Sequence, residues 1–144
     1  ISRSSGRTRW IVAGPVTGGA LLAHTIAGLL DGRRSLSHPP CSFAPFQFDG
    51  GDLTLRSFYA SVIRERRVLL ADDVRNTGKT LERCAELVQA AGGEVIATVQ
   101  IYDRLESIVE LGVPNIALIE YPGPENFAAA SCPLCAQGMP ITRF

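Results

Sequence analysis

The thirteen residues from Val68 to Thr80 read V-L-L-A-D-D-V-R-N-T-G-K-T and indicate both the fold and the chemistry of this chain. Their first part, Val68–Ala71, is a continuous apolar run, which predicts a buried strand. The residues beyond the turn predict a helix, because apolar side chains recur at helical spacing before two glycines: Leu81, Cys84, Ala85 and Val88, then Gly92 and Gly93. A turn between a strand and a helix lies at the carboxyl edge of a sheet, where open α/β folds bind ligands.

The turn combines two kinds of polar group. Residues 77–80 present free backbone amides at a helix start, and such amides suit a phosphate. Asp72 and Asp73 cannot bind the same anion, because like charges repel, so they are expected to face hydroxyl groups or a cation. A plain helix cap would explain Asn76 or Thr77 but not two consecutive acids at the end of a strand.

The same segment comes within one residue of the P-loop pattern G-x-x-x-x-G-K-[ST], with Asp73 in place of the first glycine. A carboxylate ~4 Å from a phosphate would cost roughly 1 kcal/mol in water, and about 4 kcal/mol at an effective dielectric constant near 20. A P-loop NTPase is therefore the disfavoured alternative at this motif.

Composition limits the classes of function. With 144 residues, 46% of them hydrophobic, and no net charge, the chain is expected to be one domain with a proper core and no nucleic-acid partner. The longest apolar stretch, 20–30, is too short to cross a bilayer, so no membrane is expected. Four irregularly spaced cysteines and the lack of a visible secretory signal favour the cytoplasm. Cys132 and Cys135 supply only half the ligands of a structural zinc site, and whether they bind metal is left open.

Strands and helices are expected to alternate, which predicts a single α/β domain with a mostly parallel, twisted sheet flanked by helices. Residues 1–9 are expected to be a flexible lead-in to a domain at 10–144. Pro45 predicts an edge position for the second strand. The other expected elements are strands at 10–13, 42–48, 94–102 and 116–120, an extended segment at 53–61, helices at 20–30 and 105–111, a turn at 49–52 and a loop-like tail from 121.

A second glycine-rich turn, Gly14–Gly19, follows the first expected strand. Small residues allow backbone amides to approach an anion closely, so this turn could cradle a diphosphate. An ordinary strand-to-helix turn is the alternative.

Residues 72–80, D-D-V-R-N-T-G-K-T, resemble the phosphoribosyl pyrophosphate (PRPP) loop of type I phosphoribosyltransferases. The Asp103-Arg104 pair after a strand and the C-P-L-C segment at 132–135 are similar to the orotate branch of that family. The resemblance covers residues 10–143 in outline. It implies transfer of the phosphoribosyl group of PRPP to a nucleobase, most simply orotate, with release of pyrophosphate in pyrimidine nucleotide biosynthesis.

The resemblance also implies roles for single residues, a Mg²⁺ cofactor and a homodimer. Asp72 and Asp73 would bind the ribose hydroxyls, offset positive charge on the sugar and serve as the metal site. Arg104 would grip the carboxylate of the base, which suits a planar guanidinium. The residues expected to bind PRPP are Asn76, Thr77, Gly78, Lys79 and Thr80 for the 5-phosphate, and Val16, Thr17, Gly18 and Gly19 for the pyrophosphate.

Three features depart from the family pattern. Arg75 stands where an apolar residue is usual, and it could contact a phosphate or point to solvent. Phe48 lies near the position of an expected catalytic-loop lysine; Lys79 is the only lysine in the chain, so Arg56 is the remaining catalytic cation of that loop. Only nine residues precede Trp10, so the hood over the base is expected to be reduced or absent. These departures keep open a non-catalytic PRPP-binding regulatory protein of the same fold.

Overall fold

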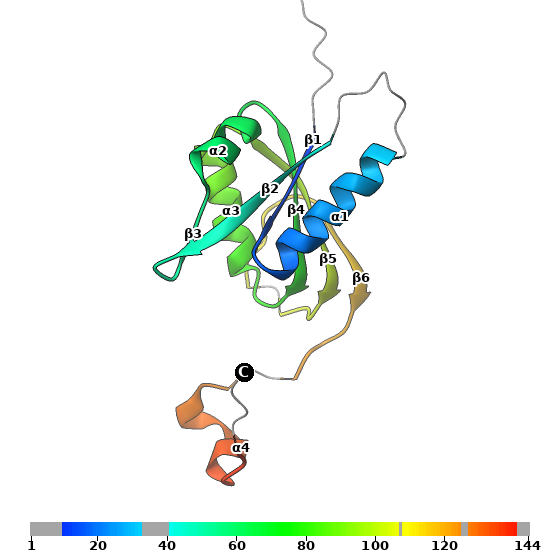
Figure 1. The fold of residues 1–144 in the computed structure, drawn as a ribbon. Coiled ribbons are helices and arrows are strands. Elements are labelled where there is room, and N and C mark those ends of the chain that lie inside the picture. The colour runs from blue at the N-terminus through cyan, green and yellow to red at the C-terminus, as the bar shows by residue number, and fades with distance from the viewer. Residues whose placement is uncertain (1–9, 33–40, 107, 125–126, 141–144) are drawn as a thin grey trace, which may run out of the picture.

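The computed structural model describes residues 10–32, 41–106, 108–124 and 127–140. One six-stranded sheet has the order β3-β2-β1-β4-β5-β6, and every pairing is parallel except that of β2 with β3. The predicted α/β fold with a mostly parallel sheet is confirmed (Figure 1). In chain order the elements are β1 (Trp10–Pro15), α1 (Gly18–Gly32), β2 (Ser42–Asp49), β3 (Asp52–Thr54), α2 (Ser57–Ile63), β4 (Arg67–Arg75), α3 (Lys79–Ala90), β5 (Glu94–Asp103), β6 (Asn115–Glu120), the 3-10 turn η1 (Ala129–Ser131) and α4 (Pro133–Ala136).

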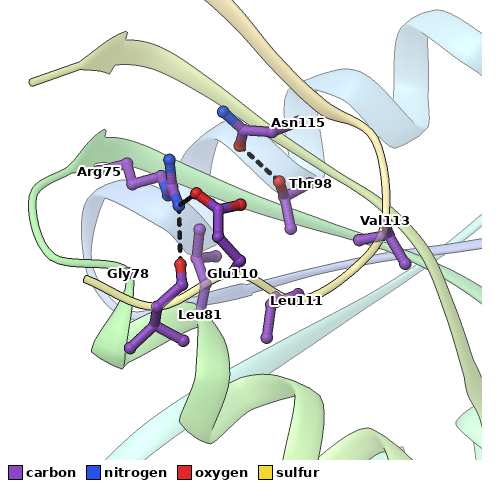
Figure 2. A pocket seen from close by; sticks show the side chains of 9 residues that line it. Arg75, Gly78, Leu81, Thr98, Glu110, Leu111, Val113 and Asn115 are labelled. Atoms are coloured by element: carbon purple, nitrogen blue, oxygen red, sulfur yellow. Dashed lines mark hydrogen bonds and ion pairs between the residues drawn. The ribbon is translucent and has the colours of Figure 1, made fainter. Parts of the chain in front are cut away.

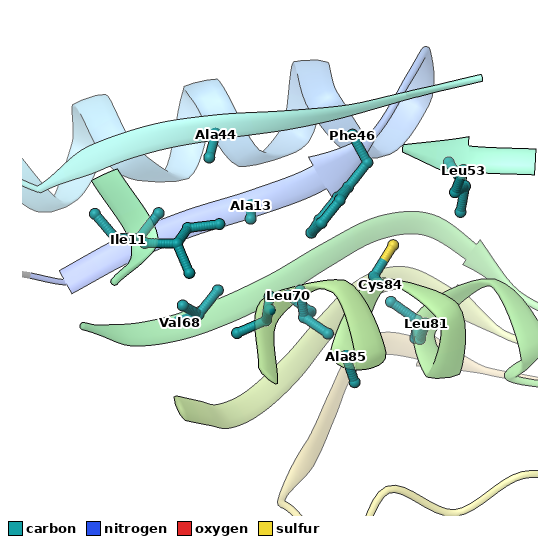
Figure 3. Close-up of a cluster of buried hydrophobic side chains, with 12 residues drawn as sticks. Ile11, Ala13, Ala44, Phe46, Leu53, Val68, Leu70, Leu81, Cys84 and Ala85 are labelled. Carbon is teal, nitrogen blue, oxygen red and sulfur yellow. The ribbon is translucent and has the colours of Figure 1, made fainter. Parts of the chain in front are cut away.

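The central strands are buried on both faces, which explains their continuous apolar runs. Successive side chains alternate between two layers, so Ile11 packs in the layer that contains α3 while Val12 packs against α1. Figure 3 shows the α3 layer, which is filled by large side chains of the sheet and by the buried face of the helix. The helical face predicted from sequence is confirmed, and its buried residues are Leu81, Cys84, Ala85 and Val88.

The extended segment expected at 53–61 is wrong in its second part. Strand β3 ends at Thr54, and α2 begins at Ser57. Two adjacent aromatic residues, Phe58 and Tyr59, are typical of strands, but Tyr59, Val62 and Ile63 have helical spacing and pack on the α3 layer. Tertiary packing therefore overrides local propensity here.

The turn expected at 49–52 is confirmed as a tight hairpin between β2 and β3. Gly50 and Gly51 have φ values of +58° and +92°, the left-handed conformation that a two-residue hairpin of this kind requires. The edge position predicted for β2 is only partly right, because β3 lies outside it. Since β3 pairs with residues 47–49 alone, Pro45 lies beyond the stretch of β2 that β3 covers.

The helix expected at 105–111 is absent from residues 105–106 and 108–111, the described part of this segment. Leu105 has a φ of +59°, and its amide donates to Asp103 Oδ1 at 2.8 Å. The amide of Val109 donates to the carbonyl of Thr77 at 3.1 Å, so the segment bonds to the turn before α3 instead of to itself. The lead-in expected at 1–9 lies outside the described residues.

The edge of the sheet formed by β6 is less covered by other elements than the centre of the sheet. Strand β6 contacts β5, and its Leu118 and Ile119 side chains are exposed. Beyond it, the tail holds the short elements η1 and α4, which Figure 1 shows apart from the sheet, so the tail is not wholly loop-like. Within the described ranges, no helix has both the length and the apolar character that a bilayer crossing requires.

Candidate functional site

The acid pair lies at the carboxyl end of β4, inside the strand rather than after it. Strand β4 continues to Arg75, four residues beyond the apolar run that predicted it. Asp72 is buried and Asp73 is exposed. Each carboxylate accepts the next backbone amide: Asp72 Oδ1 from Asp73 at 3.0 Å, and Asp73 Oδ1 from Val74 at 2.9 Å. These short local bonds orient both carboxylates at the edge of the sheet.

The acid pair has no cationic counterpart among the described side chains, since no Arg or Lys there forms an ion pair with either carboxylate. Burial, and next the hydrogen bond and charge of Asp73, raise the pKa of Asp72 to about 7. A ligand that brings hydroxyl donors or a cation would therefore relieve an unfavourable concentration of negative charge. Mg²⁺ fits this donor set, because it is commonly held by one or two carboxylates together with substrate phosphates.

The glycine-rich turn after β1 lies against the acid pair, although more than fifty residues separate the two motifs. A Cβ on Gly18 would lie 2.1 Å from Asp73 Oδ2, and one on Gly19 would lie 2.9 Å from Asp72 Oδ1. Only glycine permits this approach. Val16 anchors the turn by donating its amide to the carbonyl of Phe46 at 3.0 Å, and Thr17 is exposed beside it.

A hollow of about 110 Å³ opens at the start of α3. Gly78 precedes the helix with a φ of +86°. Among the described residues, the first helical amide has only one side-chain hydrogen bond, a long one of 3.5 Å from Lys79 N to Thr77 Oγ1. Backbone donors at a helix start with so little capping favour an anion. The hollow is lined by Asp72, Val74, Arg75, Asn76, Thr77, Gly78, Thr80 and Leu81. Lys79, predicted to bind PRPP, is exposed and does not line it.

This geometry removes the basis of the P-loop alternative. Residues 73–75, which would have to form the phosphate-wrapping loop, belong to β4. Asp73 stands at the position of the first glycine, so it places a carboxylate side chain where a P-loop requires none.

Arg104 lies beside the turn that precedes α3, and its predicted role in binding the base stays a prediction. Its guanidinium donates to Asn76 Oδ1 at 3.2 Å and to the carbonyl of Pro124 at 2.6 Å, and it pairs with Glu106 at 3.0 Å. Arg104 therefore connects the turn to the chain after β6. A carboxylate ligand would have to compete with Glu106 for the guanidinium.

Arg56, predicted as a catalytic cation, is exposed at the residue before α2. Among the described residues, no hydrogen bond or ion pair connects it to the acid pair. The hairpin that precedes it is instead bound to α3, because Arg83 forms two hydrogen bonds with Asp52, at 2.8 and 3.1 Å.

Of the two positions expected for Arg75, the one facing solvent is wrong, and Arg75 lines the hollow at the start of α3. It is 7% exposed, so it does not point to solvent, and its guanidinium pairs with Asp103 at 3.0 Å. Figure 2 shows this side chain directed toward the segment before β6. Sequence reasoning missed the role of Asp103, although charges at the ends of two adjacent predicted strands were a usable signal.

The cysteines give no support to a metal centre. In the part of the chain that the structure describes, no group of three or more His, Cys, Asp or Glu side chains could hold a metal ion. Cys41 and Cys84 are buried, whereas Cys132 and Cys135 are partly exposed around α4. Backbone and thiol hydrogen bonds with Cys135 lower the pKa of Cys132.

Comparison with known proteins agrees with this geometry. The phosphoribosyl transferase domain family matches residues 1–113. The orotate phosphoribosyltransferase of Carboxydothermus hydrogenoformans is 31% identical over 92% of this chain and 64% of the relative, and that of Pelotomaculum thermopropionicum is 32% identical over 99% and 69%. This chain thus spans only 64% of the length of the first of these relatives.

Solved structures share the fold. The adenine phosphoribosyltransferase of Thermoanaerobacter pseudethanolicus has a TM-score of 0.64 at 24% identity, over 81% of this chain and 73% of that one. The orotate phosphoribosyltransferase of Mycobacterium tuberculosis in complex with PRPP has a TM-score of 0.52 at 20% identity, over 76% and 61%. Because the domain match covers most of the sequence, the chain belongs to the phosphoribosyltransferase family, and the curated relatives compared with it are orotate phosphoribosyltransferases.

Proposed function

We propose that this chain binds PRPP and transfers its phosphoribosyl group to orotate, releasing pyrophosphate. The observation that carries the proposal is the position of the acid pair. Asp72 and Asp73 lie between a glycine turn that approaches them closely and a hollow at the start of α3. Such a site offers acceptors for sugar hydroxyls in its centre and backbone donors for phosphates at the α3 end.

The proposed binding mode follows this division. The 5-phosphate occupies the hollow and accepts bonds from the amides of residues 78–80 and from the Thr80 hydroxyl. Asp72 and Asp73 accept bonds from the ribose hydroxyls and stabilise positive charge that develops on the sugar. The pyrophosphate lies along 16–19, where the glycines leave room. Mg²⁺ held by the acid pair would neutralise the leaving pyrophosphate.

The identity of the acceptor base is the most specific part of the proposal. Orotate is favoured because the curated relatives are named for it and because Arg104 contacts Asn76 in the phosphate-binding turn. Adenine phosphoribosyltransferases share the fold at 24% identity, which supports no choice of base. A cytoplasmic homodimer is part of the same proposal, and its mass by light scattering would test the dimer.

The experiment is a titration of PRPP, with and without Mg²⁺, followed by steady-state turnover with orotate, adenine, hypoxanthine and uracil. We expect Mg²⁺-dependent binding, loss of binding in Asp72→Asn/Asp73→Asn, and turnover with orotate. PRPP binding that survives this double substitution would refute the assignment of the site. Turnover with a different base would correct only the specificity.

A non-catalytic PRPP-binding protein is the second candidate, and two observations favour it. The hairpin at 49–52 carries no lysine, and its Asp52 is held on α3 by Arg83. Mg²⁺-dependent binding of PRPP without turnover on any of the four bases would support this candidate over the enzyme.

A further inference from the structure

The ion pair between Arg75 and Asp103 lies behind the phosphate-binding turn and has no part in the function proposed above. Arg75 ends β4 and Asp103 ends β5, and the two residues are partners in the parallel register. Arg75 is 7% exposed and Asp103 is 1% exposed. A charge pair buried this deeply contributes little to net stability unless further bonds satisfy both groups.

The carboxylate of Asp103 accepts hydrogen bonds from several directions. It accepts the amide of Leu105 at 2.8 Å and the Asn115 amide nitrogen at 2.9 Å, in addition to Arg75. Burial acts to raise the pKa of Asp103, but these bonds outweigh it and hold the pKa below its usual value. Asn115 is itself fixed, because its oxygen accepts bonds from Thr98 at 2.6 Å and Gln100 at 2.7 Å. Asp103 is therefore a rigid, ionised anchor shared by β5 and β6.

The other half of the Arg75 guanidinium contacts the segment before β6. Its Nη2 donates to the carbonyl of Val109 at 2.9 Å and lies 3.6 Å from Glu110 Oε1 (Figure 2). The amide of Val109 donates in turn to the carbonyl of Thr77. Val109 is thus bonded through its carbonyl to Arg75 and through its amide to the turn.

Gly78 packs closely against both members of this contact, Val109 and Arg75. A Cβ at Gly78 would lie 2.9 Å from the Val109 carbonyl oxygen and 3.5 Å from Arg75 Nη2. Arg75 also lines the hollow at the start of α3. The backbone that presents the phosphate-binding amides therefore rests directly on Val109 and Arg75.

We propose that Arg75 is a positioning residue: anchored on Asp103, it holds Val109 against Thr77 and Gly78 and so fixes the amides of residues 78–80 toward the phosphate. The inference rests on the proposed function for the identity of the ligand, but not for the rigidity of the turn. Preorganised donors are effective because they need no rearrangement when the ligand binds. A displacement of about 1 Å can cost up to roughly a hundredfold.

A purely structural pair is the competing explanation, and the two roles can be separated. Arg75→Leu alone leaves Asp103 buried without its counter-ion and can unfold the domain. The deciding variant is Arg75→Leu/Asp103→Leu, because replacing a buried pair by apolar residues is often neutral for stability. The control is Glu86→Leu, which removes the exposed ion pair of Glu86 with Arg83 within α3, away from the turn.

Three quantities are measured on each protein: the melting temperature, the dissociation constants for ribose 5-phosphate and PRPP, and the amide hydrogen exchange of residues 78–80 without ligand. In Arg75→Leu/Asp103→Leu we expect a retained fold, faster exchange, and binding weakened roughly tenfold or more. The control should keep wild-type exchange and affinity.

Wild-type exchange and affinity in a folded Arg75→Leu/Asp103→Leu protein would overturn the positioning role. If that variant does not fold, Arg75→Lys decides in the same way, because an ammonium keeps the charge near Asp103 but lacks the fork that also reaches Val109. If the wild type binds neither ligand, the proposed function fails, and exchange at residues 78–80 alone decides: faster exchange supports the positioning role, and unchanged exchange overturns it.

Discussion

The turn after β1 and the turn after β4 both face the acid pair, yet they are held in place differently. The first turn depends on the absence of side chains: Gly14, Gly18 and Gly19 lie where a Cβ would meet backbone atoms or the carboxylates of Asp72 and Asp73. The second turn depends on side chains from distant parts of the chain. The first turn therefore requires small residues within its own sequence, whereas the second requires contacts with side chains from distant parts of the chain.

A substitution in the acid pair between the turns should produce the largest effect on the free energy of unfolding. The pKa of Asp72 is raised from 3.8 to about 7 by burial and by Asp73. A raised carboxyl pKa favours the fold at low pH, and this contribution is lost as the pH rises through about 7. Asp72→Asn should therefore increase the free energy of unfolding at pH 8 by up to ~4 kcal/mol relative to the wild type, and much less at pH 4.

Urea unfolding of both proteins at pH 4, 6 and 8 without Mg²⁺ measures this difference. Addition of Mg²⁺ and PRPP should reduce the advantage of Asp72→Asn, because ligand that binds only the native wild type stabilises it. A constant difference between the two proteins across the three pH values would contradict the electrostatic account.

Gly14→Ala tests the first turn and should have the next largest effect. Its Cβ would lie 2.3 Å from the Gly19 carbonyl oxygen and 2.6 Å from that of Ala71, and backbone atoms cannot move away cheaply. We expect a loss of about 3 kcal/mol in the free energy of unfolding. Gly28→Ala in α1 is the control, because a Cβ there meets nothing within 4 Å; it should stabilise the protein by roughly 0.5–1 kcal/mol. Equal stability of the two variants would refute the steric explanation.

Gly18→Ala separates binding from folding in the same turn. The three atoms nearest to its Cβ would all belong to the carboxylate group of Asp73, an exposed side chain that can rotate away into solvent. The fold should be retained, while PRPP affinity falls roughly tenfold to a hundredfold because Asp73 is displaced. Calorimetric titration and a melting curve measure the two effects. Wild-type affinity in the folded variant would show that the position of Asp73 is unimportant for binding.

The contrast between the turns also explains which features the sequence could predict. Val68–Thr80 and Gly14–Gly19 carry their own strand, turn and helix signals, so the mostly parallel sheet and the order of strand, turn and helix in both segments are predicted correctly. The segment 105–111 lacks such local signals for its conformation. Its conformation is set by bonds from Asp103, Thr77 and Arg75, and no local pattern encodes these. The ion pair of Arg75 was missed for the same reason, since its partners lie 28 and 34 residues away.

Substitution of Arg104 should have the smallest effect of those considered, and it tests two roles, because Arg104 belongs to both the second turn and the proposed base site. Arg104→Lys keeps the charge but loses the planar fork, so the KM for orotate should rise about tenfold while PRPP affinity changes less. Glu106→Gln should act in the opposite direction, because it removes the carboxylate that competes at 3.0 Å for the guanidinium. Steady-state kinetics with each substrate varied in turn distinguishes the two roles. The opposite outcome would be weaker PRPP binding with an unchanged KM for orotate in Arg104→Lys. Arg104 would then act through Asn76 as a support of the turn. In that case the second turn depends on distant side chains even more than the contacts of Arg75 imply.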